Sequence, residues 1–173
     1  MKFELSQLHE NDCAAAFDLA TQVFVNGSTL HLSLGVELEE YRQHLSASFL
    51  DMVREGLSVV IKNNDDGSVV ACMVVTDFSN QFVEAPEQIS KFSPLSSLTK
   101  ELCRGYQDGK APDAGTAILI DMAAVDPIAR GQGLYQRMRD AVHLNARERG
   151  FKSVVGELSS ATTQEHVINR LGH

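Results

Sequence analysis

The most constraining feature of this sequence is a near-continuous apolar run, TAILIDMAAV, at residues 116–125. Such a run predicts a β-strand covered on both faces, because a strand with one face in water alternates apolar and polar residues. We expect it to be the central strand of a sheet. Directly after it, VDPIARGQG leads into residues 134–146, where apolar residues recur at helical spacing. A covered strand that feeds a helix through a glycine turn indicates an α/β fold.

Weaker signals surround this unit on both sides. Residues 2–8 alternate well enough for an edge strand, and two helices are expected next, one capped by Asn11 and one from about Val36 to Glu55. The runs LSVVIK and SVVACMVVTDF flank NNDDG, which predicts an antiparallel hairpin. KSVVGEL predicts another strand, and ATTQEHVINRL a last helix. Residues 79–115 are irregular apart from a short helix around Leu95 to Tyr106, and a connection this long is either functional or a surface excursion.

Composition excludes several classes of protein. A chain of 173 residues fits one domain, residues 1–173. The net charge of -8 disfavours nucleic acid and anionic membranes as partners, since both need a basic surface. The first residues form no apolar leader and no run is long enough to cross a bilayer, so we expect a cytoplasmic protein. The three cysteines match no metal-binding spacing, and no metal site is expected.

The glycine turn itself indicates an anion site. A strand that enters a helix through Gly131 and Gly133 exposes backbone N–H groups at the positive end of the helix dipole, where phosphate binds. A tight turn with no ligand is the alternative from this pattern alone. A dinucleotide-binding Rossmann fold would need a third glycine, where Tyr135 and Gln136 stand, and the Gly-Lys-Ser/Thr of a P-loop is absent.

MAAVDPIARGQGLYQRM resembles motif A of the GNAT superfamily of acyl-CoA N-acyltransferases, Val-x-Pro followed by Arg/Gln-x-x-Gly-x-Gly/Ala. The expected order of elements is also similar to that superfamily along nearly all of the chain. The resemblance implies a three-layer α/β fold with a mixed, mostly antiparallel sheet between helices, here without the last two strands. NGSTLHLSLGVELEEYRQHL and ELSSATTQEHVINRLGH are faintly similar to arylalkylamine N-acetyltransferases.

The resemblance implies an N-acetyltransferase that moves an acetyl group directly from acetyl-CoA, its cosubstrate, to a small amine or amino-acid-like acceptor. Backbone groups of β-strand residues would bind the pantetheine arm, and the turn would hold the diphosphate. The implied pantetheine residues are Met122, Ala124 and Val125, and the implied diphosphate residues are Arg130, Gly131, Gln132, Gly133, Leu134 and Tyr135. A local bulge in the strand usually makes room for the thioester in this superfamily. Whether the chain forms a homodimer is left open.

Asp121 and Glu157 are the candidate proton acceptors. An alkylamine is almost wholly protonated at neutral pH, so its proton must be taken up before it attacks a thioester. Asp121 interrupts an apolar strand, where a charge is costly unless it is paired or used, and Glu157 stands in the equivalent position of the next strand. A carboxylate bonded to backbone or arginine at a sheet end is the alternative for each.

The chain departs from the superfamily pattern at several positions. Tyr135 replaces the last Gly/Ala of the motif, Ala161 replaces an asparagine, and Ile168 stands where a tyrosine commonly protonates the departing thiolate. These departures motivate a rival hypothesis, a non-catalytic acyl-CoA-binding or interaction domain on the same fold.

Overall fold

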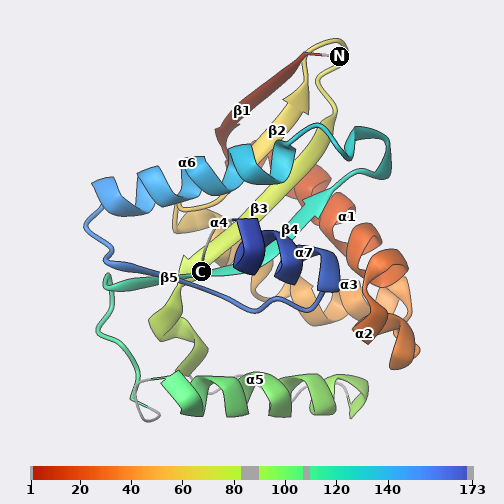
Figure 1. The fold of residues 1–173 in the computed structure, drawn as a ribbon. Coiled ribbons are helices and arrows are strands. Elements are labelled where there is room, and N and C mark those ends of the chain that lie inside the picture. The colour runs from red at the N-terminus through yellow and green to blue at the C-terminus, as the bar shows by residue number, and fades with distance from the viewer. Residues whose placement is uncertain (1, 83–89, 107–109, 171–173) are drawn as a thin grey trace.

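The computed structural model describes residues 2–82, 90–106 and 110–170. Its helices and strands form a single α/β arrangement (Figure 1). In chain order they are β1 (Phe3–Gln7), α1 (Glu10–Gly27), α2 (Thr29–Ser33), α3 (Leu38–Ser46), α4 (Phe49–Arg54), β2 (Val59–Asn63), β3 (Val69–Asp77), α5 (Ser93–Gly105), β4 (Ala117–Val125), α6 (Leu134–Glu148), β5 (Ser153–Gly156) and α7 (Ala161–Glu165). A π-helical segment, His166–Arg170, continues α7.

The five strands form one sheet in the order β1-β2-β3-β4-β5. Neighbouring strands are antiparallel except β4 and β5, which are parallel, so the predicted mixed, mostly antiparallel sheet is confirmed. The prediction that β4 is the central strand was wrong, because β3 holds that place and β4 is next to the edge. An apolar run shows that a strand is covered, and it does not show how many strands lie beyond it. The described residues form no strand after β5.

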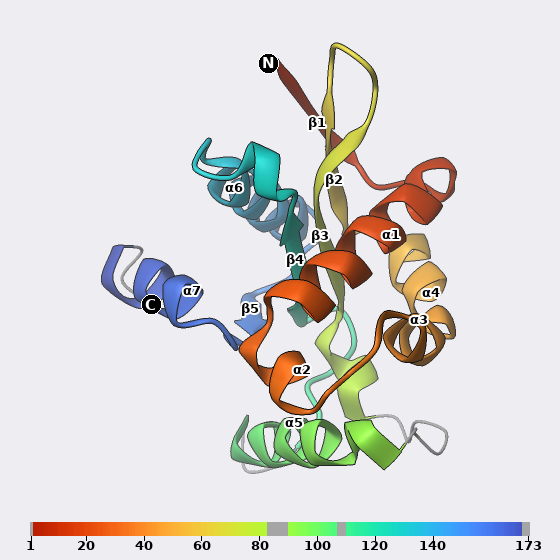
Figure 2. The same cartoon turned by 90° about the vertical axis from the view of Figure 1, so that its right-hand side faces the viewer.

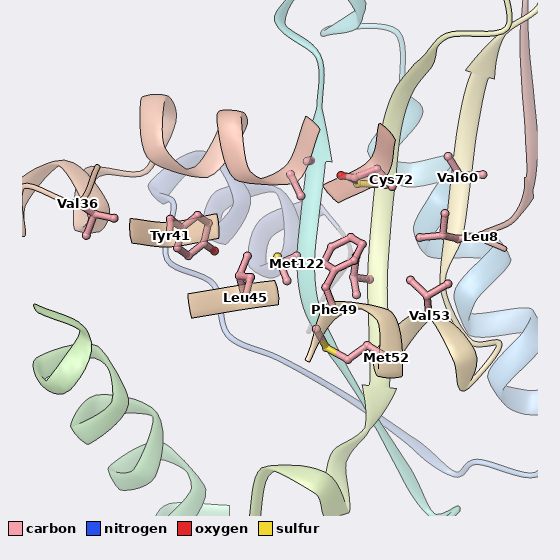
Figure 3. Packing of buried hydrophobic residues seen from close by; sticks show 14 of the residues in the cluster. Leu8, Val36, Tyr41, Leu45, Phe49, Met52, Val53, Val60, Cys72 and Met122 are labelled. Carbon is pink, nitrogen blue, oxygen red and sulfur yellow. Dashed lines mark hydrogen bonds between the residues drawn. The ribbon is translucent and has the colours of Figure 1, made fainter. Parts of the chain in front are cut away.

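Helices cover the sheet on both faces, which confirms the predicted three layers. Figure 2 shows α1, α3 and α4 on one side of the strands and α6 and α7 on the other. The first core contains Tyr41, Phe49 and Met122, whose side chains are drawn in Figure 3. The second joins α6, through Met138 and Val142, to the opposite face of β2, β3 and β4. Alternate residues of the strands therefore supply two separate cores.

The ends of α6 follow from the residues around it. Asp126 accepts a hydrogen bond from the backbone N–H of Ile128 (2.9 Å), which closes a 3₁₀ turn before the glycines. At the other end Gly150 has a φ of 91°. Its N–H donates to Arg147 and that of Phe151 to Ala146, the pattern of a Schellman motif. Local sequence thus fixes the helix that begins at the candidate anion site.

Two of the expected helices differ from the prediction. The helix expected over 36–55 is broken at residues 47–48, where the hydroxyls of Ser46 and Ser48 donate to carbonyls three residues earlier and compete with the helical pattern. The predicted cap at Asn11 was wrong, because α1 begins at Glu10 after His9. The helix expected around 95–106 is confirmed as α5.

No helix in the described parts of the chain is long and apolar enough to cross a membrane.

Candidate active site

Asp121 lies at a bulge in β4. Val74 of β3 is opposite Met122, whereas the next residue, Val75, is opposite Ile120, so Asp121 has no partner across the β3–β4 ladder. A bulge of this kind inserts one residue and bends the strand. The structure therefore contains the bulge that the resemblance implied, and it places the one charge of the strand there.

The pairing of β4 with β5 ends at the same place. Its last pair is Ile120 with Gly156, although β4 continues to Val125. Asp121 is the next residue of β4, and Glu157 is the first residue after the end of β5. Beyond them, no described strand pairs with β4 on the side of β5. The strands thus separate at the two carboxylates, and from Asp121 onward one edge of β4 has no neighbouring strand within the described parts of the chain.

The two carboxylates influence each other. Burial, and to a lesser extent the negative charge of Glu157, raises the pKa of Asp121 to about 6. The side chain of Glu157 is more exposed, yet desolvation still raises its pKa, and a hydrogen bond from Thr99 of α5 (3.2 Å) opposes this. An acid whose pKa lies near neutrality can accept and release a proton under ordinary conditions.

An aromatic cluster lies beside Asp121. Burial and the charge of Asp121 raise the pKa of Tyr41, so the carboxylate is close to that ring. Tyr41 stacks edge-on against His31 (ring centroids 4.6 Å apart), and His44 stacks on Phe92 (4.2 Å). His31 is buried, and burial lowers its pKa. These rings form one aromatic cluster, in which Tyr41 and Phe92 belong to the first core.

An open cavity of about 400 Å³ lies next to Glu157. It is formed by α2, by Leu98 of α5, and by the segment that joins β5 to α7, including Leu158. Glu157 adjoins it, because Leu158 is its chain neighbour and its partner Thr99 follows Leu98. Threonine and serine side chains from these elements and Gln164 of α7 complete the lining, which contains no charged residue among those that the structure describes. That α2 and α5 both line this cavity could not be predicted from the sequence, because the two helices are far apart in the chain.

The glycine turn before α6 is open to solvent. Gly131 and Gly133 have φ values of 75° and 71°, which favour glycine, and a Cβ added to either would meet no atom within 4 Å. The backbone N–H groups from Gly131 to Tyr135 have no hydrogen-bond partner among the described residues. A row of unpaired N–H groups at a helix N-terminus is the geometry that binds phosphate.

Arg130 does not lie over this turn. Its Nε–H donates to the carbonyl of Val125 at the end of β4 (3.5 Å), and its guanidinium approaches Gly27 at the end of α1. The carbonyl of Val125, one of the candidate pantetheine residues, is therefore occupied by Arg130. Met122 and Ala124 are buried, with their side chains in the core formed with α1 and α3, so only their backbone groups remain for a ligand.

Three solved structures show what the fold is similar to. The C-terminal condensation domain of Ebony, in complex with beta-alanyl-dopamine, has a TM-score of 0.86 and 18% identity, covering 98% of this chain and 82% of that one. Arylalkylamine N-acetyltransferase 2 from Aedes aegypti has a TM-score of 0.74 and 17% identity, over 99% and 82% of the chains. The aminoglycoside N-acetyltransferase AAC(6')-Iy in complex with CoA has a TM-score of 0.56 and 13% identity, over 99% and 87%. The chain has the GNAT fold.

The likeness to arylalkylamine N-acetyltransferases predicted from the sequence is thus confirmed at the level of the fold. No family model and no curated protein matches the sequence. Within the GNAT fold of this chain, the two candidate carboxylates lie together at the point where β4 and β5 separate. The glycine turn, which contains the candidate diphosphate residues, follows the part of β4 that does not pair with β5. The candidate residues therefore follow one another in the chain from the bulge of β4 to the start of α6.

The structure shows where Tyr135 and Ile168, two departures from the superfamily pattern, lie. The ring of Tyr135 packs edge-on against His166 (centroids 5.8 Å apart), so it points toward the end of α7 and leaves the turn open. Ile168 is half-exposed, and an aliphatic side chain supplies no proton to a departing thiolate. The first departure is compatible with a ligand at the turn, whereas the second removes one proton donor.

Proposed function

We propose that this chain is an N-acetyltransferase that transfers an acetyl group from acetyl-CoA to a small amine in a direct, ternary-complex reaction. The observation that carries the proposal is the continuity of three features. The free edge of β4 begins at Asp121, it leads to the open turn at Gly131 and Gly133, and the cavity adjoins Glu157 at its other end. A thioester held along β4 would meet an amine entering from the cavity at the carboxylates.

The residues present fit coenzyme A. The N–H groups from Gly131 to Tyr135 would hold its diphosphate, with no side chain in the way. Backbone groups of Met122 and Ala124 would pair with the pantetheine arm as a neighbouring strand does, while the carbonyl of Val125 becomes available only if Arg130 moves. AAC(6')-Iy, which shares the fold, binds CoA in its structure. Bound acetyl-CoA supplies the activated acetyl group.

Asp121 would act as the proton acceptor. A pKa of about 6 leaves it mostly ionised at neutral pH, and a base this close to neutrality is better matched to the task than an ordinary carboxylate. Once the amine is neutral, its nitrogen attacks the acetyl carbon. The C–N bond would form and the C–S bond would break, with the electron pair of the C–S bond staying on sulfur. The second proton, which the nitrogen loses as it becomes an amide, would pass to solvent, and solvent would protonate the thiolate. Glu157 would help to hold the proton taken up by Asp121.

The lining of the cavity favours an acceptor with one amine on an uncharged body. Among the described residues, leucine, serine, threonine and glutamine line the space, and Glu157 is next to one of them in the chain. A polycationic acceptor would need further carboxylates along the cavity. Ebony's condensation domain, which shares the fold, was solved in complex with beta-alanyl-dopamine, and the aromatic cluster around Tyr41 is the part of this chain that would suit an acceptor with an aromatic ring.

The proposal is tested by substituting Gly133 with glutamate. A carboxylate about 4 Å from a phosphate costs about 4 kcal/mol at an effective dielectric constant of about 20, which is more than a hundredfold in affinity. Isothermal titration calorimetry with CoA should therefore show at least this loss. Gly67→Glu is the matched control, since Gly67 also has a positive φ (73°) and open surroundings but lies in the β2–β3 turn. Equal CoA affinity in the two variants would exclude the turn as the site.

The rival function is acyl-CoA binding without catalysis. It is favoured by Ile168, which stands where the superfamily commonly has a proton-donating tyrosine. Thiol release from acetyl-CoA, measured with a panel of monoamines, polyamines and amino acids, separates the two. Release with a monoamine, lost in Asp121→Asn, supports the enzyme. Tight CoA binding without release for any amine supports the rival.

A further inference from the structure

His166, in the π-helical segment that continues α7, contacts the first turn of α6. Its ring packs edge-on against Tyr135, and its Nε2 lies 3.2 Å from Oε1 of Gln136. Tyr135 also carries the last of the unpaired backbone N–H groups of the glycine turn. The fold therefore brings a titratable side chain next to the candidate diphosphate site, from a segment about 30 residues further along the chain.

Asp140 determines which nitrogen of His166 carries the proton. The side-chain N–H of Gln136 donates to the carboxylate of Asp140 (2.7 Å), one turn further along α6. The amide oxygen of Gln136 therefore faces His166, and because this oxygen only accepts hydrogen bonds, Nε2 of His166 is the donor. The other ring nitrogen, Nδ1, has no hydrogen-bond partner among the described residues. A second proton on this ring therefore adds at Nδ1.

The charged groups around His166 come from α6 and from its own segment. On α6, Asp140 contacts it only through the amide of Gln136, and Arg139 is buried. Burial raises the pKa of Tyr135 and the positive charge of Arg139 opposes this, so the guanidinium lies close to the same ring. Glu165 precedes His166 in the chain and is exposed. His166 forms no ion pair with any described residue, so an anionic ligand would be its first direct partner of opposite charge.

We infer that His166 takes up a proton when coenzyme A binds and donates a hydrogen bond from Nδ1 to the diphosphate at the glycine turn. The proton comes from solvent, and the hydrogen bond from Nε2 to Gln136 stays in place. The inference rests on the proposed function, since it assumes a diphosphate at this turn. Coenzyme A then binds more tightly as pH falls through the range in which histidine becomes charged, because the charged ring is part of its site.

The test uses dephospho-CoA, because the 3′-phosphate monoester of coenzyme A itself titrates at about pH 6. Isothermal titration calorimetry should show binding at least about fivefold tighter at about pH 6 than at about pH 8, as expected for one hydrogen bond to a charged group. His166→Gln keeps a donor for Gln136 but takes up no proton, and it should abolish this difference. His9→Gln is the matched control, because His9 is exposed and makes no side-chain hydrogen bond to the start of α1.

Nuclear magnetic resonance of the ¹⁵N-labelled imidazole rings detects the proton directly. In the free protein at about pH 8, the His166 signals should be those of a ring protonated at Nε2 alone. Saturating dephospho-CoA at about pH 7 should move the Nδ1 signal to the range of a protonated nitrogen, and the signals of His9 should not change. A ring that stays neutral in the complex would overturn the inference.

Two calorimetric results would also overturn it, and they differ from failure of the proposed function. Equal affinity of the wild type at both pH values is one. The other is a pH dependence that persists in His166→Gln, because another group such as Asp121 would then be its source. In both cases dephospho-CoA still binds, and Gly133→Glu still weakens it. If dephospho-CoA binds at neither pH, or binds equally well to Gly133→Glu, the diphosphate site and this inference fail together.

Discussion

Replacing Asp121 with asparagine should stabilise the folded protein at neutral pH and remove its proposed activity. Burial and Glu157 raise the pKa of this carboxyl from 3.8 to about 6. Folding therefore favours the protonated form. The ionised group costs nothing below about pH 4, where it is protonated in both states, and its cost grows as pH rises to about 6.

The size of this effect follows from the shift. About two pKa units at about 1.4 kcal/mol each give a cost of about 3 kcal/mol above pH 6. Asparagine resembles the protonated acid in shape and carries no charge. The variant should be more stable than the wild type by up to about 3 kcal/mol near pH 7.5 and about equally stable near pH 4.

Urea unfolding followed by circular dichroism measures this difference, since the chain has no tryptophan for fluorescence. Glu157→Gln is the matched control. It removes the smaller cause of the shift and should give a smaller gain at neutral pH. A gain in Asp121→Asn that is the same at both pH values would refute the reasoning, because it would show that ionisation of Asp121 carries no cost in the folded state.

Three further predictions concern catalysis by the carboxylates, the cavity and the core. Asp121→Asn should lower kcat by about 10²- to 10⁴-fold. Glu157→Gln should mainly shift the acidic limb of the pH–rate profile to lower pH, because the charge of Glu157 raises the pKa of Asp121. An unshifted limb would show that Glu157 does not influence Asp121 during the reaction. Leu98→Glu should raise KM for the amine and leave KM for acetyl-CoA within about twofold. Equal changes in both KM values would indicate that the amine binds outside this cavity. Met138→Ala should reduce the free energy of unfolding by about 2–5 kcal/mol in urea titrations, because Met138 of α6 is fully buried against the sheet. A loss below about 1 kcal/mol would contradict that packing.

Local patterns were sufficient to predict much of the fold. The β2–β3 hairpin, the covered strand β4 and the helix α6 each follow from residues that are adjacent in the chain. Gly131, Gly133 and Gly150 have the positive φ values that such turns require. The sequence also singled out Asp121 as an unusual charge. The structure adds that this residue is at a bulge, where its pKa is raised.

Features that depend on distant segments could not be predicted. The cavity beside Glu157 requires α2 and α5 to meet the segment after β5, and no local pattern encodes that contact. The hydrogen bond from Arg130 to Val125 was missed for a different reason, because an arginine beside a phosphate-binding turn is expected to face the phosphate. The break after α3 depends on serine hydroxyls that bond to carbonyls within the helix, which apolar spacing does not reveal.

The central claim is that unpaired N–H groups at the start of α6 bind the diphosphate of coenzyme A. Nuclear magnetic resonance of ¹⁵N-labelled protein titrated with CoA tests it most directly. The account predicts that the largest shifts of backbone N–H signals occur at Gly131, Gln132 and Gly133, with smaller ones along β4 from Asp121 to Val125. Saturable CoA binding that leaves these signals in place and shifts others would contradict it.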